Sequence, residues 1–256
     1  MSRSALIAGA IRSRSATATA PPASPESRSG EVLLSCREVD VSFGELAVLR
    51  AASLAVYRGE SHFLIGPNGA GKTTLANVIT GHVAASGGSI EFCGKRLQGA
   101  PWRRARRGIA RKFQVPRVFP RLDAAQNLEL AGALGDREER ERELAELGSA
   151  PAEQLSHGQK QWLELLMALA RRPLLAVLDE PTAGMTREER NALAAQIREL
   201  RGEVTFLVVE HDLEFVALAA DRVSFLHQGE LLLTGAFDEV AADPTVRSVY
   251  LGEAAG

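Results

Sequence analysis

One short stretch, residues 66–74, restricts most strongly what this chain can fold into. It reads G-x-x-x-x-G-K-[ST], follows the apolar run 62–65 and leads into residues 74–79, which favour a helix. Glycines in such a turn let consecutive backbone N–H groups point at an anion, at the positive end of the following helix. The order of strand, turn and helix therefore predicts a phosphate-binding loop. Its predicted contacts come from Gly66, Pro67, Asn68, Gly69, Ala70, Gly71, Lys72, Thr73 and Thr74.

Two side chains of this loop carry specific predictions. Lys72 is expected to reach the β- and γ-phosphates of a nucleotide as a point charge, and the Thr73 hydroxyl is expected to bind Mg²⁺. The alternative is a glycine-rich turn that binds nothing, but the flanking strand and helix favour the nucleotide site. The motif does not say which task the nucleotide drives, so the rest of the chain must decide it.

The composition limits the classes of protein to which this chain can belong. Its 256 residues suffice for one large α/β domain or two small ones. The formal net charge of −2 argues against bulk attraction to nucleic acid or anionic lipid. Cys36 and Cys93 lack metal-ligand spacing and are interpreted as reduced thiols of a cytosolic protein. No apolar run approaches the ~18 residues of a membrane span, so any membrane role must come through a partner.

Residues 1–30 differ in composition from the rest of the chain. They are rich in Ser, Ala, Arg and Pro and hold one acid, Glu26, which predicts a disordered extension. The apolar run 5–11 faintly resembles a signal peptide, but it is at the lower length limit, and Arg12 and Arg14 follow it. A disordered extension or a misassigned start codon is the favoured interpretation.

Strand patterns dominate the chain from residue 31 to the phosphate-binding loop. Apolar and polar residues alternate in 39–43 and 52–57 and predict antiparallel strands, with a turn at Gly44. Phe43, beside that turn, could stack on adenine or fill the core, and the pattern alone favours the core. After the loop, a strand is expected at 89–92. A basic block at 102–121 is interpreted as a solvated face, or as a patch for an acidic partner loop, because it has little aromatic interleaving.

Helix and strand patterns alternate through the second half of the chain. A strand from Gly108 is expected to run into a loop at Gln114, and two charged helices follow, the second from Asp136 to about Gly148. Buried strands at 174–178 and 204–209 place polar residues at their carboxyl ends, where open parallel sheets bind ligands. The alternation predicts a parallel α/β core. The polar residues at these strand ends are Asp179, Glu180, Glu210, His211 and Asp212.

Taken in order, these pieces resemble the ATP-binding subunit of an ABC transporter over residues 31–256. After the phosphate-binding loop come a glutamine loop at Gln114, a signature at 155–159, the strand at 174–181 and a switch histidine at His211. The resemblance implies an α/β P-loop NTPase core of the ABC ATPase type, with an antiparallel β subdomain and a short α-helical subdomain at about 115–172. It also makes Phe43 the expected adenine platform.

The resemblance implies two such subunits that face head to tail with two ATP molecules between them. Ser156, Gly158 and Gln159 would then meet the γ-phosphate held by the other subunit, at a helix N-terminus that favours anions. Ser156 and Gln159 also fit a capping box, so an ordinary helix start is the alternative.

The resemblance also implies roles for four residues in hydrolysis. Asp179 would hold Mg²⁺ through its water shell, and Gln114 would touch the metal and the attacking water. Glu180 would polarise that water or accept its proton, and His211 would position the γ-phosphate. For His211 the alternative is a solvated turn histidine.

Narrower matches point to importers for branched-chain amino acids and urea. Residues 181–186 and 246–252 resemble that class, and 111–114 and 155–164 resemble its urea-type ATPase, with His157 in place of the usual signature glycine. A urea importer is therefore the main expectation. The alternatives are a branched-chain amino acid importer, a lipopolysaccharide-type exporter, a non-transport ABC ATPase acting on ribosomes or DNA, and a P-loop kinase or GTPase.

The expected partners follow from the same resemblance. They are a second ATPase subunit, with a heterodimer favoured over a homodimer, transmembrane permease subunits, and indirectly an external solute-binding protein. Nucleic acid is not among them. The expected location is the cytoplasmic face of the inner membrane, with the chain attached peripherally.

Overall fold

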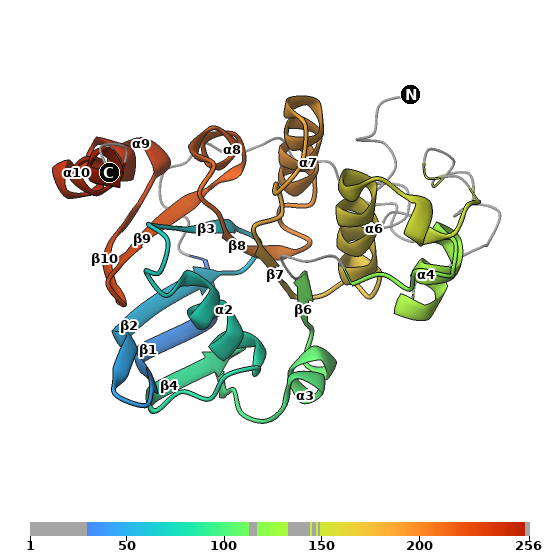
Figure 1. The fold of residues 1–256 in the computed structure, drawn as a ribbon. Coiled ribbons are helices and arrows are strands. Elements are labelled where there is room, and N and C mark those ends of the chain that lie inside the picture. Colours follow the sequence, from blue (N-terminus) through green and yellow to red (C-terminus); the bar gives the residue numbers. More distant parts are fainter. Residues whose placement is uncertain (1–29, 113–116, 133–143, 145–146, 148, 254–256) are drawn as a thin grey trace.

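The computed structural model describes residues 30–112, 117–132, 144, 147 and 149–253 (Figure 1). Three of the predictions fall outside these residues. They are the N-terminal extension, the glutamine loop at Gln114, and most of the charged helix expected from Asp136.

One sheet is antiparallel and has four strands, ordered β2-β1-β4-β5. Strands β1 and β2 come before the phosphate-binding loop in the chain, and β4 and β5 come after it. Strands β1 and β2 form a hairpin whose turn includes Gly44, at a φ of 61° that glycine adopts without strain. This confirms the predicted antiparallel entry. The strands are β1 (Val32–Phe43), β2 (Leu46–Tyr57), β4 (Gly87–Phe92) and β5 (Lys95–Arg96).

A second sheet of six strands, ordered β10-β9-β3-β8-β7-β6, forms the centre of the molecule. Its strands from β9 to β6 pair in parallel, and β10 pairs antiparallel with β9. Every residue of β3, β7 and β8 is buried, as expected for parallel strands covered on both faces. The strands are β3 (Ser61–Ile65), β6 (Ile109–Lys112), β7 (Leu175–Asp179), β8 (Thr205–Val209), β9 (Arg222–His227) and β10 (Glu230–Gly235).

Helices cover both faces of the six-stranded sheet (Figure 1). None of the helices in the described part of the chain combines the length and the apolarity that a membrane crossing requires. The helical elements are α2 (Lys72–Thr80), α3 (Pro101–Arg106), α4 (Ala124–Ala131), the 3-10 turn η1 (Ala152–Gln154), α6 (His157–Leu169), α7 (Arg187–Glu199), α8 (Leu213–Ala219), α9 (Phe237–Ala242) and α10 (Pro244–Glu253).

Alternate residues of the central strands face two separate apolar cores. Phe63 and Val208 pack with α6, α7 and α8 on one face. Leu64 and Val177 pack with α2 and the antiparallel sheet on the other. The period of two along each strand therefore places the helix that follows the phosphate-binding loop opposite α6.

The basic block is not the solvated face that its composition suggests. Arg104 is 8% exposed, and its guanidinium donates to the carbonyls of Val78 and, at 2.8 Å, Ile79 in the last turn of α2, where cations satisfy unpaired carbonyls. Lys112 is fully buried. The interpretation was wrong for these residues because a count of charges does not show which of them face inward. Trp102 does point outward and is 54% exposed.

Candidate nucleotide site

The phosphate-binding loop joins the end of β3 to the start of α2, as predicted. Gly66 has a φ of 147°, and a Cβ there would lie 2.0 Å from the carbonyl oxygen of Leu226. Gly71, the N-cap of α2, has a φ of 106°, and a Cβ there would lie 2.8 Å from the side chain of Leu49. Only glycine fits these two positions. Since Gly71 has no side chain to cap α2, the first N–H groups of the helix are available to an anion.

Lys72 lies inside the loop. Its ammonium donates to the carbonyls of Gly66 at 2.6 Å and Pro67 at 2.7 Å, and the residue is 6% exposed. The cation is thus held over the cradle by the loop itself, at the position where a phosphate would replace carbonyls as its partner.

Thr73 and Asp179, both predicted to hold Mg²⁺, lie against each other. Asp179 ends β7, is 2% exposed, and accepts a hydrogen bond of 3.2 Å from the Thr73 hydroxyl. No group of three His, Cys, Asp or Glu side chains suited to a metal occurs among the described residues. One hydroxyl and one carboxylate nevertheless fit Mg²⁺, which keeps several waters and uses few protein ligands together with substrate phosphates.

Glu180 and His211 meet at the neighbouring strand ends. Glu180 has a φ of 46°, which is uncommon for a side chain other than glycine, and its N–H donates to the carbonyl of Val209 at the end of β8. Its carboxylate lies 3.8 Å from Nδ1 of His211, and the His211 side chain is 58% exposed. The structure therefore brings together the two residues predicted to act on the attacking water and the γ-phosphate.

Two residues at this edge were missed as site residues. Glu210 is fully buried and accepts hydrogen bonds from Thr182, His211 and Asp212. Arg111 donates to Asp179 at 3.1 Å. An acid directly after a buried strand was a signal for Glu210, whereas Arg111 was hidden inside the basic block.

The signature segment begins α6. Ser156 is the N-cap; its hydroxyl accepts from the N–H of Gln159, and the Gln159 side chain accepts from the N–H of Ser156. The capping box is confirmed. Gly158 lies between them, and a Cβ there would lie 3.0 Å from the Glu189 carboxylate. Helices α6 and α2 lie on opposite faces of the sheet. That Ser156, Gly158 and Gln159 contact the nucleotide held by a second subunit's phosphate-binding loop stays a prediction.

Phe43 ends β1 and is 54% exposed. The residue pattern alone had favoured a place in the core, and this was wrong, because the hairpin turn that follows Phe43 lies at the surface. An exposed aromatic ring is available for stacking, so its role as an adenine platform stays open to test.

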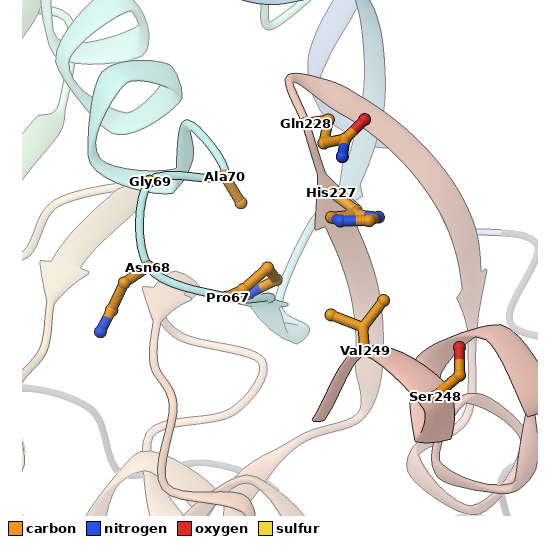
Figure 2. A pocket seen from close by; sticks show the side chains of 8 residues that line it. All are labelled: Pro67, Asn68, Gly69, Ala70, His227, Gln228, Ser248 and Val249. Atoms are coloured by element: carbon orange, nitrogen blue, oxygen red, sulfur yellow. The ribbon is translucent and has the colours of Figure 1, made fainter. Parts of the chain in front are cut away.

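A hollow of about 450 Å³ borders the outer side of the loop (Figure 2). The turn between β9 and β10 supports this side, since the N–H of Gly229 donates to the carbonyl of Ala70 at 3.0 Å. Helix α10 closes the hollow with Ser248 and Val249, which belong to the segment 246–252 that resembled the importer class but had been given no place beside the loop. Its lining residues are Pro67, Asn68, Gly69, Ala70, His227, Gln228, Ser248 and Val249.

Comparisons with known proteins agree with this geometry. The family described as ABC transporter matches residues 49–183. The chain is 34% identical over 251 residues to the high-affinity branched-chain amino acid transport ATP-binding protein BraF of Pseudomonas aeruginosa, which covers 87% of this chain and 98% of BraF. LivG of Escherichia coli, described in the same words, is 33% identical with the same coverage.

Solved structures show the same fold. The ADP conformation of MJ1267, an ATP-binding cassette of an ABC transporter, matches with a TM-score of 0.77 and 28% identity, over 87% of this chain and 99% of that one. A dimeric post-hydrolysis state of the cassette MJ0796, bound to ADP and Pi, matches with a TM-score of 0.69 and 25% identity, over 80% and 99% of the two chains. The chain belongs to the ABC transporter family of ATP-binding proteins and is an ABC ATPase.

Proposed function

We propose that this protein is the ATPase subunit of an importer for branched-chain amino acids. The cargo is inferred from BraF and LivG, to which the chain is similar over almost their whole length. The sequence pattern had favoured urea. The relatives named above do not support urea, and the amino acid alternative fits them better.

The observation that carries the ATPase chemistry is the contact between Thr73 and Asp179 at the open end of the phosphate-binding loop. Bound Mg²⁺ would supply charge neutralisation for the β- and γ-phosphates, with the Thr73 hydroxyl binding it and Asp179 holding it through its water shell. The N–H groups of residues 66–74 and the Lys72 ammonium would bind the phosphates themselves. All of these groups lie at one edge of the sheet, so binding requires no rearrangement of the strands.

Glu180 and His211 would act on the reaction beyond the γ-phosphate. Glu180 would accept a proton from the attacking water, or polarise it, and His211 would hold the γ-phosphate oxygens and orient Glu180 across their 3.8 Å separation. Gln114 lies outside the described residues, and its contact with the metal and the attacking water stays a prediction. Phe43 would stack on the adenine.

The site is expected to be completed by a second subunit. Ser156, Gly158 and Gln159 would face the γ-phosphate of that partner, so ATP would join the two subunits and hydrolysis would release them. The dimeric MJ0796 structure, which contains ADP and Pi, supports this arrangement. A heterodimer with a related ATPase is favoured. Permease subunits would hold the pair at the cytoplasmic face of the inner membrane, with a solute-binding protein outside.

Uptake measurements test both the cargo and the mechanism. Cells of the source organism carrying Lys72→Ala are compared with cells carrying Lys95→Ala, which changes an exposed lysine of β5, for uptake of labelled leucine and labelled urea. We expect Lys72→Ala to abolish leucine uptake and to leave urea uptake at the parental rate. Lys95→Ala should leave the uptake of both solutes at the parental rate. Loss of urea uptake alone would return the cargo to urea. Parental uptake of both solutes would exclude both cargoes.

A further inference from the structure

The register between β6 and β7 brings an arginine to the metal side of the site. Arg111 pairs with Val177, and Lys112 pairs with Leu178. Side chains alternate between the faces of a sheet, so Arg111 shares the face of Val177 and, two residues on, of Asp179. This is the face that α2 covers, and it is the face on which Thr73 lies.

The guanidinium of Arg111 connects α2 to the end of β7. One nitrogen donates to Asp179 Oδ2 at 3.1 Å. The other donates to Asn77 Oδ1 at 2.6 Å and to Thr80 Oγ1 at 2.8 Å, both on α2. The Arg111 and Asp179 side chains are 7% and 3% exposed, so water screens this ion pair little. A planar fork fixes geometry as well as charge, which a lysine at the same place would not do.

Both oxygens of the Asp179 carboxylate therefore have assigned partners. Oδ2 faces Arg111, and Oδ1 faces the hydroxyl of Thr73. Because Arg111 is anchored on the middle and end of α2, while Thr73 stands in the first turn of that helix, the arginine sets the separation between helix and strand end. That separation determines whether Thr73 and Asp179 can share one cation.

We propose that Arg111 is a positioning residue for the metal, which acts by holding Asp179 and the helix that carries Thr73 in register. This inference rests on the proposed function, in which Thr73 and Asp179 hold Mg²⁺. A positive charge so close to the site also repels a cation, so simple electrostatics predicts the opposite effect of removing it. The sign of the change in metal affinity therefore separates the two accounts.

The test measures nucleotide binding, not turnover. The affinity of the full-length protein for a fluorescent ATP analogue is determined in EDTA and then across a titration of free Mg²⁺. The variants are Arg111→Gln, Arg111→Lys and Asn77→Ala; the last removes one of the two contacts of Arg111 with α2, keeps the contact with Thr80 and keeps the charge. Arg107→Gln is the matched control, since that guanidinium donates to the carbonyls of Phe92 and Arg96 away from the site. Thermal unfolding in EDTA establishes that each variant is folded.

We expect Arg111→Gln to raise the half-saturating Mg²⁺ concentration about tenfold, as loss of a partner behind a metal ligand commonly does, with Mg²⁺-free affinity within about twofold of the parent. Arg111→Lys should recover part of the loss. Asn77→Ala should shift in the same direction by less, and it carries the test if Arg111→Gln does not fold. Arg107→Gln should match the parent.

An unchanged or lowered half-saturating concentration in Arg111→Gln, or parental behaviour of Asn77→Ala where only that variant folds, would overturn the positioning role and leave the proposed function standing. Failure of the proposed function looks different. If the parent protein binds the analogue equally well with and without Mg²⁺, the metal assignment of Thr73 and Asp179 falls, and the role of Arg111 falls with it.

Discussion

The buried carboxylate of Glu210 accepts hydrogen bonds from both the N–H and the hydroxyl of Thr182, which lies in the loop after Glu180. Its second oxygen accepts from the N–H groups of His211, at 2.9 Å, and Asp212, at 3.2 Å. One side chain thus holds the two loops that carry Glu180 and His211. Four donors from these two loops therefore converge on one buried carboxylate.

Glu210→Gln is expected to lower both stability and activity. The amide of glutamine turns a donor toward N–H groups that need an acceptor, which leaves buried groups unpaired and costs about 1–3 kcal/mol in the free energy of unfolding. Chemical denaturation measures this loss, and ATP hydrolysis should fall because His211 is no longer fixed. Glu214→Gln, on the exposed face of α8, is the control. Equal denaturation midpoints for the two variants would show that the Glu210 charge is not needed.

Much of the fold could be predicted because its signals are local. Strand alternation, the buried runs at β7 and β8, and the capping box at Ser156 depend on residues close together in sequence, and each was placed correctly. The phosphate-binding loop could be predicted for the same reason, since its glycines are directly followed in the sequence by helix α2.

The rest of the site depends on contacts between distant segments. Arg111 reaches Asp179 across 68 residues because β6 and β7 pair in one register, and no local pattern specifies that register. The same pairing buries Lys112 on the opposite face. Ser248 and Val249 of α10 line the hollow beside the loop. Their segment, 246–252, resembled an importer class, but that resemblance does not say which part of the fold the segment packs against.

Glu180→Gln is expected to stop turnover while ATP binding is retained. Glutamine keeps the shape of the side chain but cannot accept a proton from water, so ATP should stay bound and hold two subunits together. The measurement combines phosphate release with size-exclusion chromatography in ATP. The matched control is Glu203→Gln, an exposed acid before β8. A variant that releases phosphate at the parental rate would remove Glu180 from the role of base.

Ser156→Arg is expected to disable hydrolysis without weakening ATP binding to the isolated subunit. The long cation would block the face that meets the partner's γ-phosphate. The change also removes the N-cap of α6, which costs about 1 kcal/mol, so Ser156→Ala separates the cap from the block. Thr186→Ala, which removes the equivalent cap of α7, is a second control. If the isolated Ser156→Arg subunit bound ATP more weakly while both alanine variants bound it normally, Ser156 would belong to the nucleotide site of its own subunit.

A buried charge pair joins β6 to α6. Lys112 is fully buried, donates to the side-chain oxygen of Gln161, and lies 3.8 Å from the Glu164 carboxylate. Burial lowers the pKa of the Lys112 ammonium, and the Glu164 charge opposes that shift. This pair lies on the sheet face opposite Arg111, and it ties the strand that leads to Gln114 to the helix that begins at Ser156.

Lys112→Met is expected to lower the free energy of unfolding by about 3–5 kcal/mol, because it removes the cation from beside a buried carboxylate. The double variant Lys112→Met with Glu164→Leu should recover most of this loss, since apolar side chains of similar size often replace a buried pair at little cost. Denaturation at pH 7 measures both, with Lys95→Met as an exposed control. If the double variant is as unstable as the single one, the ion pair alone is not the source of the loss. The hydrogen bonds from Lys112 to Gln161 and from the N–H of Arg117 to Glu164 would then join strand and helix.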